Sequence, residues 1–388
     1  MWLSQIVSNL GDAVNYIALV VDVYKISGSG IALSTLVLFQ IIPIILIGPL
    51  AGAVIDHFPR KRVLIAADLA RAVLVLGLVA AQAVWQLYVL AFCLSLAGAF
   101  FTPAFSASIP QLIEGDDLVA ANAVTWSTAQ FVQIIGSALS GGLIALAGVH
   151  TAFAFNAVSF LFSAAMIWRV PFPPLFAQGM KQTGNSYLES IREGIRYARS
   201  DRFVSRMFLI QILASLAVGG TSALLVVLAE RRYNLPAAGF ATFLLAIGLG
   251  ALLGPLILGG MIRSHGDANA LFLPYVIRGA GDVLLGVFTV PLLGQTLLFV
   301  YGLNTSTGMV TYQSAMQSEV PDAVRGRVFA LMDVGWNAAR IVSVGLAGVL
   351  ADRFGIAIVY YVGGALLIGA GILGLTTVRL SVGYHETP

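Results

Sequence analysis

The sequence predicts an all-α membrane protein whose twelve transmembrane helices form two six-helix pseudo-repeats. Hydrophobic residues make up 59% of the 388 residues and charged residues only 10%, whereas soluble proteins are about half apolar and about a quarter charged. The apolar residues come in blocks long enough to cross a bilayer. The second half of the chain also repeats features of the first half at a nearly constant offset.

Five long blocks contain no Asp, Glu, Lys or Arg: 26–55, 72–113, 118–168, 235–262 and 283–318. A transmembrane helix needs about 20 residues, so the longest blocks must each hold more than one helix. Division at the charged, glycine-bearing and proline-bearing junctions predicts twelve spans, at residues 2–25, 31–55, 63–84, 87–110, 119–147, 151–169, 205–229, 237–262, 270–290, 295–317, 326–350 and 356–378.

The distribution of basic residues predicts that both termini lie in the cytoplasm. With that orientation, fourteen Lys and Arg residues flank the spans on the cytoplasmic side. Only four lie on the outer side: Lys25, Arg231, Arg232 and Arg353. Cytoplasmic loops of membrane proteins carry such an excess of basic residues. The remaining three basic residues lie inside spans.

An offset of 206 or 207 positions superimposes features of the two halves. Arg71 meets Arg278, Gly148 meets Gly355, and the Gly-Pro-Leu sequence at 48–50 recurs at 254–256. Parallel repeats of this kind are typical of transporters that move one half against the other around a site near the middle of the membrane. We therefore expect an N-terminal six-helix bundle at 1–169, a cytoplasmic linker at 170–204 and a C-terminal six-helix bundle at 205–388.

The linker contains a predicted amphipathic helix. Ser186 and Glu189 have the spacing of a capping box, and apolar side chains fall on one face of the helix while Arg192, Arg196 and Arg199 fall on another. This pattern predicts a helix at the cytoplasmic surface of the membrane. Of two interpretations, we favour a solvated linker helix that clamps the two halves together. The alternative is that this helix is a regulatory site.

A polar stripe crosses the eleventh span. Asp333, Asn337 and Arg340 are spaced by four and three residues, which places them on one helical face. The repeat puts Trp126, Gln130 and Gln133 at the same places in the fifth span. Such a stripe would be costly against lipid. It predicts either the lining of a water-filled cavity, which we favour, or hydrogen bonds between helices at about 0.6 kcal/mol each.

The loop between the second and third spans reads GAVIDHFPRKR at residues 52–62. This loop resembles the signature G-x-L-x-D-R-x-G-R-[KR] of the major facilitator superfamily. Together with IAADLARA at 65–72 and LVAANAV at 118–124, it is similar to the drug:proton antiporter branch with the macrolide efflux proteins and the enterobactin exporter. The resemblance covers nearly the whole chain and implies the major facilitator fold, with alternating access.

The resemblance also implies a cytoplasmic gate made by one acid and a basic cluster: Gly52, Asp56, Arg60, Lys61 and Arg62. Opposite charges near a surface attract by about 4 kcal/mol at a separation of about 4 Å, enough for a few contacts to bias a two-state protein if they form in one state only. The same basic residues also suit anionic lipid headgroups. His57 and Pro59 depart from the signature, and the second half has Arg263 where the aspartate is expected.

Three acids inside spans are candidate proton carriers: Asp12, Asp282 and Asp333. Asp12 lies near the middle of the first span, and its repeat partner Val218 is apolar. Ionisable groups at such depth mark ion pathways and proton relays in transporters. Asp12 is therefore expected either to load and unload a proton or to bond to neighbouring helices.

Two acid–arginine pairs are spaced by about one helical turn: Asp68 with Arg71 and Arg278 with Asp282. This spacing favours structural ion pairs. Asp333 and Arg340 are too far apart for such a pair. Both are expected to reach a common cavity, where Arg340 holds Asp333 ionised or meets an anionic group of a substrate.

Catalytic and redox functions have no support in the sequence. The single cysteine, Cys93, excludes an internal disulfide and a thiolate metal cluster. No zinc-protease motif or P-loop is present, and the GAGILG sequence at 369–374 lies in the twelfth span, where it predicts helix packing rather than dinucleotide binding. We expect neither an enzyme nor a protein that needs a cofactor, a metal or nucleic acid.

We therefore expect a monomeric secondary transporter of the bacterial inner membrane that exports a hydrophobic or amphipathic small molecule in exchange for protons. The expected cavity residues are Trp126, Gln130, Gln133, Tyr301, Asn304, Trp336 and Asn337. Apolar cavities with few polar groups suit such ligands. The alternatives are a siderophore or lipid exporter, an importer, or a membrane scaffold or sensor without transport.

Overall fold

The computed structural model describes residues 1–55, 58–112, 128, 132, 135–136, 139–144, 146–172, 187–257 and 268–378. Within these ranges the chain forms helices and no strand. The helices of the first half are α1 (Trp2–Ser27), α2 (Gly30–Ile55), α3 (Arg60–Val79), α4 (Val84–Leu112) and α6 (Val149–Arg169). Those that follow are α7 (Tyr187–Ser200), α8 (Arg202–Ala223), α9 (Leu225–Arg231), α10 (Ala237–Ile257), α12 (Ala268–Val287), α13 (Pro291–Glu319), α14 (Asp322–Phe354) and α15 (Ile356–Thr377).

These helices coincide with the predicted spans except at the fifth. Most of the predicted span 119–147 lies outside the described residues. The seventh span is interrupted at Leu224, which leaves the helical region with φ −104° and ψ 19°, so that α8 and α9 are separate helices. Eight described helices are long and apolar enough to cross a membrane. The all-α membrane fold is therefore confirmed, whereas the count of twelve spans extends into the part of the chain that is not described.

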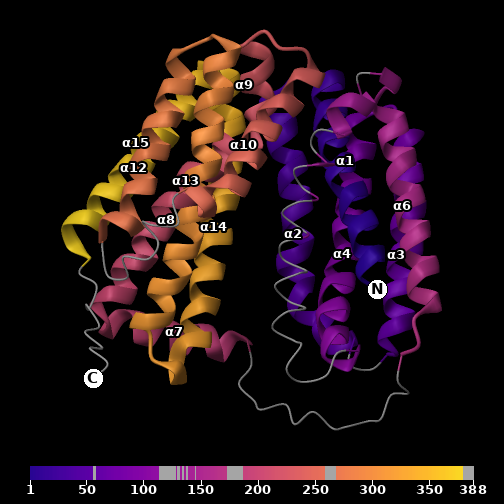
Figure 1. Cartoon of the computed structure of the whole chain (residues 1–388), viewed down its shortest axis with the longest axis horizontal. Coiled ribbons are helices and arrows are strands. Elements are labelled where there is room, and N and C mark those ends of the chain that lie inside the picture. The colour runs from indigo at the N-terminus through magenta and orange to yellow at the C-terminus, as the bar shows by residue number, and fades with distance from the viewer. Residues whose placement is uncertain are drawn as a thin grey trace. The chain divides into compact units, whose positions relative to one another are not determined.

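The chain divides into two compact units (Figure 1). The first comprises Met1–Met180 with Leu235–Leu245, and the second Lys181–Asn234 with Ala246–Pro388. In the first unit α1 packs on α6, and α3 packs on α6 and α4. In the second unit α8 packs on α15, and α12 packs on α15 and α13. The helix pairs therefore recur in the same order, which agrees with the repeat in the sequence.

The backbone carries the same repeat at two glycines. Gly148 precedes α6 with φ 81°, and Gly355 precedes α15 with φ 86°. A positive φ at these positions favours glycine because a side chain would be strained there. The two residues are 207 positions apart, so the sixth helix of each unit begins after the same kind of turn.

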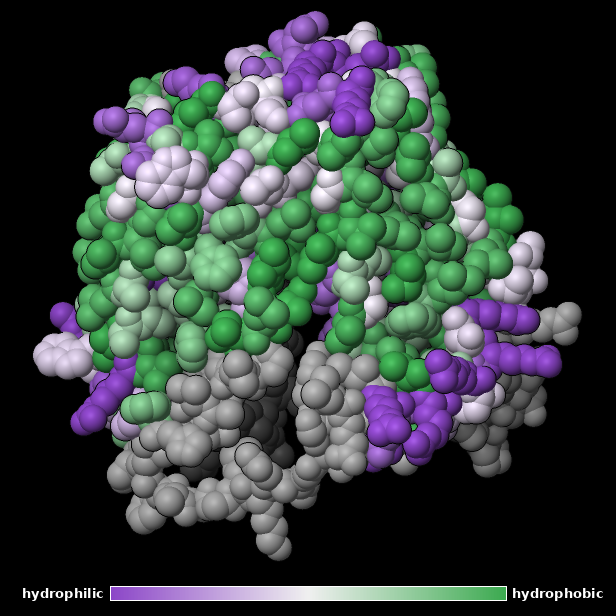
Figure 2. Space-filling model, turned by 180° about the vertical axis from the view of Figure 1, so that it is seen from behind, coloured by the Kyte–Doolittle hydropathy of each residue, from purple (hydrophilic) through white to green (hydrophobic). Residues whose placement is uncertain are grey.

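The surface matches a bilayer environment. On the face shown in Figure 2, hydrophobic residues cover the middle of the helices and hydrophilic residues gather toward their ends. Large apolar side chains such as Val73, Trp85 and Leu292 are 69%, 64% and 72% exposed. Exposed apolar surface of this extent indicates contact with lipid rather than water.

Glycines let α12 and α15 approach closely. A Cβ atom on Gly279 would lie 2.6 Å from the carbonyl oxygen of Gly364, and one on Gly364 would lie 2.5 Å from the carbonyl oxygen of Gly279. Two glycines of the GAGILG sequence, Gly371 and Gly374, pack in the same way against Val276 and Phe272. Small residues at helix interfaces are characteristic of membrane proteins, and the interpretation of this sequence as a packing motif is confirmed.

Replacement of Gly279 by valine is expected to lower the free energy of unfolding by about 1–3 kcal/mol or more, because the added methyl groups would meet backbone atoms that cannot move aside. Gly281→Val on the same helix is the matched control, since a Cβ there meets nothing within 4 Å. Unfolding in mixed micelles titrated with SDS measures both. Equal stability of the two variants would contradict the close approach of α12 and α15.

Candidate functional site

The second unit contains a cavity of about 390 Å³ whose walls come from α8, α12, α13, α14 and α15. This volume is in the range of small-molecule sites. The polar wall consists of Gln211, Tyr275, Arg278, Tyr301, Asn304, Thr305, Tyr312, Gln313 and Asp333. The apolar wall consists of Ala214, Val218, Pro274, Met309, Phe329, Met332, Trp336 and Leu367. The mixture suits a ligand that is largely apolar and has a few polar groups.

Helix α13 supplies the longest polar edge of the cavity. Tyr301, Asn304, Gly308 and Tyr312 line it at spacings of three and four residues, so they share one helical face. The Asn304 amide donates to the carbonyl of Val300 at 2.8 Å. Its side chain is thereby held at the wall while its own carbonyl oxygen remains available to accept.

The structure places several predicted cavity residues in this wall. Tyr301, Asn304, Trp336 and Asp333 line the cavity. Asn337 is not among the lining residues, and its amide donates to the backbone carbonyl of Asp333 at 2.9 Å. The other three residues of that expectation, Trp126, Gln130 and Gln133, lie outside the described residues.

The expectation that Arg340 reaches a cavity between the halves stays a prediction, and the cavity of the second unit does not include it. Arg340 is exposed, it does not line the cavity, and it forms no ion pair with another described residue. Seven residues return a helix to nearly the same face but advance it by about 10 Å. Arg340 therefore lies two turns beyond Asp333 and misses the cavity that Asp333 reaches.

Arg278 contacts an aromatic residue instead of the expected acid. Its guanidinium carbon lies 3.9 Å from the centre of the Tyr301 ring, and its Nη2 donates to the Tyr301 hydroxyl at 2.5 Å. Asp282, one turn further along α12, is 2% exposed and forms no ion pair with a described residue. Its Oδ2 is buried without a hydrogen-bond partner. The predicted Arg278–Asp282 ion pair is therefore absent, and the hydrogen bond of the guanidinium goes to Tyr301 on α13 instead.

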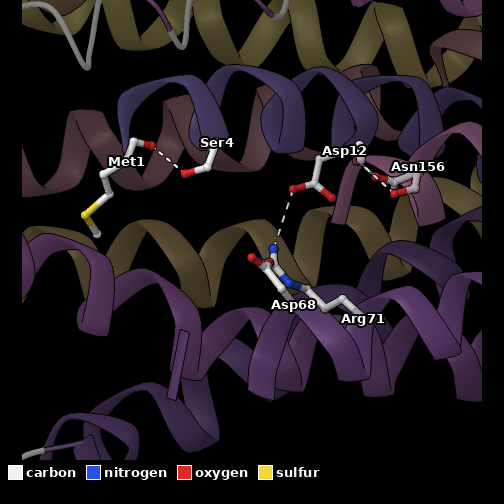
Figure 3. A network of polar contacts seen from close by, with 7 residues as sticks. Met1, Ser4, Asp12, Asp68, Arg71 and Asn156 are labelled. Atoms are coloured by element: carbon white, nitrogen blue, oxygen red, sulfur yellow. Dashed lines mark hydrogen bonds and ion pairs between the residues drawn. The ribbon is translucent and has the colours of Figure 1, made fainter. Parts of the chain in front are cut away.

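Arg71 is the centre of an ion network in the first unit (Figure 3). Its Nη2 donates to Asp68 on the same helix, and its Nη1 lies 3.8 Å from Oδ2 of Asp12 on α1. The guanidinium also stacks between Phe101 and Phe160, at 4.1 and 4.3 Å from the ring centres. Cation–π contacts of this kind strengthen when water is excluded.

The two carboxylates differ in their access to solvent. The Asp68 side chain is fully buried and that of Arg71 is 8% exposed, whereas the Asp12 side chain is 46% exposed. Asp68 is thus the buried partner of the arginine, and Asp12 is the partner whose side chain is partly exposed. The contact between Asp12 and Arg71 joins two helices, and sequence spacing could not predict it.

Several cavity residues were not predicted. Gln211, Tyr275 and Tyr312 line the wall, and the Tyr275 hydroxyl lies 3.4 Å from Oε1 of Gln211. The polar face of α13 was a usable signal, because Tyr312 continues the spacing of Tyr301 and Asn304. Gln211 and Tyr275 lie on α8 and α12, where sequence spacing alone does not tie them to a cavity, and only the tertiary contact between their side chains marks them.

A family model described as a transmembrane secretion effector matches residues 1–386. The chain belongs to this family of the major facilitator superfamily. The resemblance seen at residues 52–62 is thereby confirmed. The match extends over both units and supports a transporter rather than an enzyme.

Known members of the superfamily match nearly the full chain. The MFS-type transporter YfiS of Bacillus subtilis is 28% identical over 389 residues, covering 96% of this chain and 91% of the relative. Macrolide efflux protein A of Streptococcus pyogenes is 23% identical and covers 96% and 94%. The enterobactin exporter EntS of Escherichia coli is 24% identical and covers 88% and 82%.

Solved structures show the same fold. The nucleoside transporter NupG superposes with a TM-score of 0.76 at 12% identity, over 97% of this chain and 98% of that one. An inward-facing bacterial homologue of the iron transporter ferroportin gives a TM-score of 0.72 at 16% identity, over 96% of each chain. At these identities the likeness concerns the major facilitator fold alone.

The signature loop of the superfamily is described only in part. Asp56 lies outside the described residues, and so does the side-chain environment of Gly52. Lys61 donates to the carbonyl of Val170 at 2.7 Å, and its Nζ lies 5.9 Å from the centre of the Phe172 ring. Lys61 thus links the start of α3 to the chain that follows α6. Arg62 is exposed and Arg60 half-buried at the same end of α3.

The linker helix α7 packs on α14 in the second unit of this transporter. Arg327 Nε lies 2.6 Å from Oε2 of Glu193. A Cβ on Gly194 would lie 2.6 Å from the carbonyl oxygen of Arg327, so the two helices approach closely there. Charge pairing and a glycine contact together fix α7 to this unit.

Replacement of Arg71 by glutamine is expected to lower the free energy of unfolding by about 3–5 kcal/mol, because the fully buried Asp68 would lose the charge that compensates it. Arg231→Gln is the matched control. Arg231 pairs with Asp352 at 3.2 Å at an accessible position, where a pair contributes about 1 kcal/mol or less. SDS titration in mixed micelles measures both, and a loss no larger for Arg71→Gln than for Arg231→Gln would contradict the compensating role.

Proposed function

We propose that the protein is a secondary active transporter that exports hydrophobic or amphipathic small molecules in exchange for protons, by alternating access. The observation that carries this proposal is the cavity of about 390 Å³ inside the second unit, with a polar edge on α13 and an apolar wall around Trp336. A cavity of that composition binds a largely apolar ligand and fixes its orientation through a few polar contacts.

The relatives favour export as the direction. The Streptococcus pyogenes relative is an efflux protein for macrolides, and the Escherichia coli relative exports enterobactin. The names of both relatives state export as the direction of transport, and neither name supports import. We further propose a location in the bacterial inner membrane with both termini in the cytoplasm, an orientation that the distribution of Lys and Arg supports.

Asp12 is our choice for the proton-coupling residue. Its side chain is the exposed member of the Asp12–Arg71–Asp68 network. A deprotonated Asp12 attracts Arg71, and a protonated Asp12 leaves the guanidinium to Asp68 and the two phenylalanine rings. Protonation therefore changes a contact between α1 and α3, and a proton can favour one conformation only through such a differential interaction.

The cytoplasmic gate would act at the signature loop. The basic cluster of Arg60, Lys61 and Arg62 stands at the start of α3, and Lys61 is held there by its contacts with Val170 and Phe172. Contacts from this cluster that form in one state only would bias the equilibrium between inward-open and outward-open conformations.

Asp12→Asn is expected to abolish the stimulation of export by an imposed pH gradient, because an amide cannot exchange a proton at this position. Exchange of labelled for unlabelled substrate without a gradient should persist. Both are measured with purified protein in liposomes, using a macrolide as the first substrate, and Asp282→Asn and Asp333→Asn are tested in parallel.

Asp22→Asn is the control on the same helix, since Asp22 lies near the C-terminal end of α1 and outside the Asp12–Arg71–Asp68 network. A full gradient response in Asp12→Asn would remove Asp12 as the carrier, and loss in only one of the other variants would assign the role there. Absence of flux with macrolide, siderophore and lipid substrates alike, with and without a gradient, would favour a scaffold or sensor.

A further inference from the structure

Arg71 and Arg278 occupy equivalent positions in the two units. They are 207 residues apart, and each lies on a helix, α3 or α12, that packs against the last helix of its unit. Each guanidinium lies over aromatic rings from neighbouring helices: Phe101 and Phe160 for Arg71, and Tyr301 for Arg278. The repeat has therefore kept a stacked arginine in both units.

The second unit does not repeat the two carboxylates that surround the arginine in the first unit. Asp68 and Asp12 approach Arg71. At the equivalent offsets of 207 and 206 positions the second unit has Tyr275 and Val218. Both of these residues line the cavity, next to Arg278. A closed ion network in the first unit thus corresponds to an arginine facing an open cavity in the second.

Arg278 forms no ion pair with a carboxylate among the described residues, although its charge acts on the buried Asp282 one turn along α12. Its Nη2 donates to the Tyr301 hydroxyl, and its Nε is buried without a hydrogen-bond partner. Asp282 is one turn away but forms no ion pair with it and does not line the cavity. A cation that is partly buried and incompletely satisfied favours an anion that supplies the missing acceptors.

Asp333 is the only carboxylate among the described residues that line the cavity. Asp333 is an exposed residue of α14, so water can solvate its charge. The guanidinium of Arg278 is less accessible and gains more from a partner of opposite charge. The two charges therefore favour a ligand whose anionic group meets Arg278, rather than a cation held by Asp333.

We propose that Arg278 is the anchor for an anionic group, a carboxylate, sulfonate or phosphate ester, on the amphipathic ligand of this cavity. The proposal rests on the proposed function in that the cavity receives the cargo. The Tyr301 hydroxyl accepts from the guanidinium and can itself donate to a ligand beside it. Phe329, Met332 and Trp336 supply the apolar wall for the rest of the ligand.

The test is equilibrium dialysis of the purified protein in phosphatidylcholine nanodiscs, with empty nanodiscs subtracted. Three probes share one ring system: 2-naphthoate, the neutral 2-naphthamide and the cationic 2-naphthylmethylamine. The wild type is expected to bind 2-naphthoate at least about tenfold more tightly than the other two, the size of effect expected for a charge-assisted hydrogen bond.

Arg278→Gln is expected to weaken 2-naphthoate binding by about tenfold to a hundredfold and to leave 2-naphthamide binding nearly unchanged, which also reports that the variant is folded. Arg278→Lys keeps a point charge without the planar fork and should retain part of the preference. Arg340→Gln is the matched control, because Arg340 is exposed and outside the cavity wall. It should leave all three affinities unchanged.

The proposal is overturned if the wild type binds none of the probes, if it does not prefer 2-naphthoate, or if the preference survives in Arg278→Gln. Tighter binding of the amine, lost in Asp333→Asn, would assign the cavity to cations. Nanodiscs containing phosphatidylglycerol identify the natural source of the anion. If phosphatidylglycerol competes with 2-naphthoate in the wild type but not in Arg278→Gln, the natural anion is a lipid headgroup. If phosphatidylglycerol does not compete, the natural anion belongs to a free amphiphile.

No gradient or flux enters this measurement. Selective binding without transport would therefore overturn the proposed function and leave the anion site in place. Transport without selective binding would overturn the anion site and leave the transporter.

Discussion

The structure depends on the cost of placing a guanidinium within apolar helices. Each unit has one arginine at the same place in the repeat, Arg71 or Arg278, and each must be compensated where water is scarce. The first unit compensates with two carboxylates and two phenylalanine rings. The second has a tyrosine in contact with the arginine and the carboxyl of Asp282 one turn away, and its arginine lines a cavity. The units have thereby become different while keeping one architecture.

Close helix packing provides the frame in which these charges are held. Gly279 and Gly364 bring α12 against α15 at a distance that no larger residue allows. This contact fixes α12, which carries Tyr275, Arg278 and Asp282, relative to the rest of the unit. In a membrane such packing replaces the hydrophobic effect as the force between helices. The position of the cavity wall is therefore set by residues that do not themselves face the cavity.

The solvent access of the acids separates their roles. Asp68 and Asp282 are buried, at 0% and 2% exposure, so their charges are controlled by the helices around them. Asp12 and Asp333 are accessible, the first beside Arg71 and the second at the cavity. Proton exchange and ligand contact require access, whereas stability requires compensation. This difference in exposure is the reason that Asp12 is proposed, ahead of Asp282, as the residue that exchanges a proton.

The sequence alone determined the class of protein, the repeat, the family and the positions of most of the described helices, but not the break between α8 and α9. These follow from local quantities: uncharged blocks set the spans, glycines such as Gly148 and Gly355 set the turns, and the loop at 52–62 carries the signature. The sequence also singled out Tyr301, Asn304 and Trp336 as cavity residues, and these three line the cavity of the second unit.

The pairing rules failed where a partner came from another helix. Only the tertiary structure turned Arg278 from Asp282 to Tyr301, joined Asp12 to Arg71 and left Arg340 outside the cavity. Residue spacing gives the face of one helix, whereas helix packing decides which neighbour that face meets.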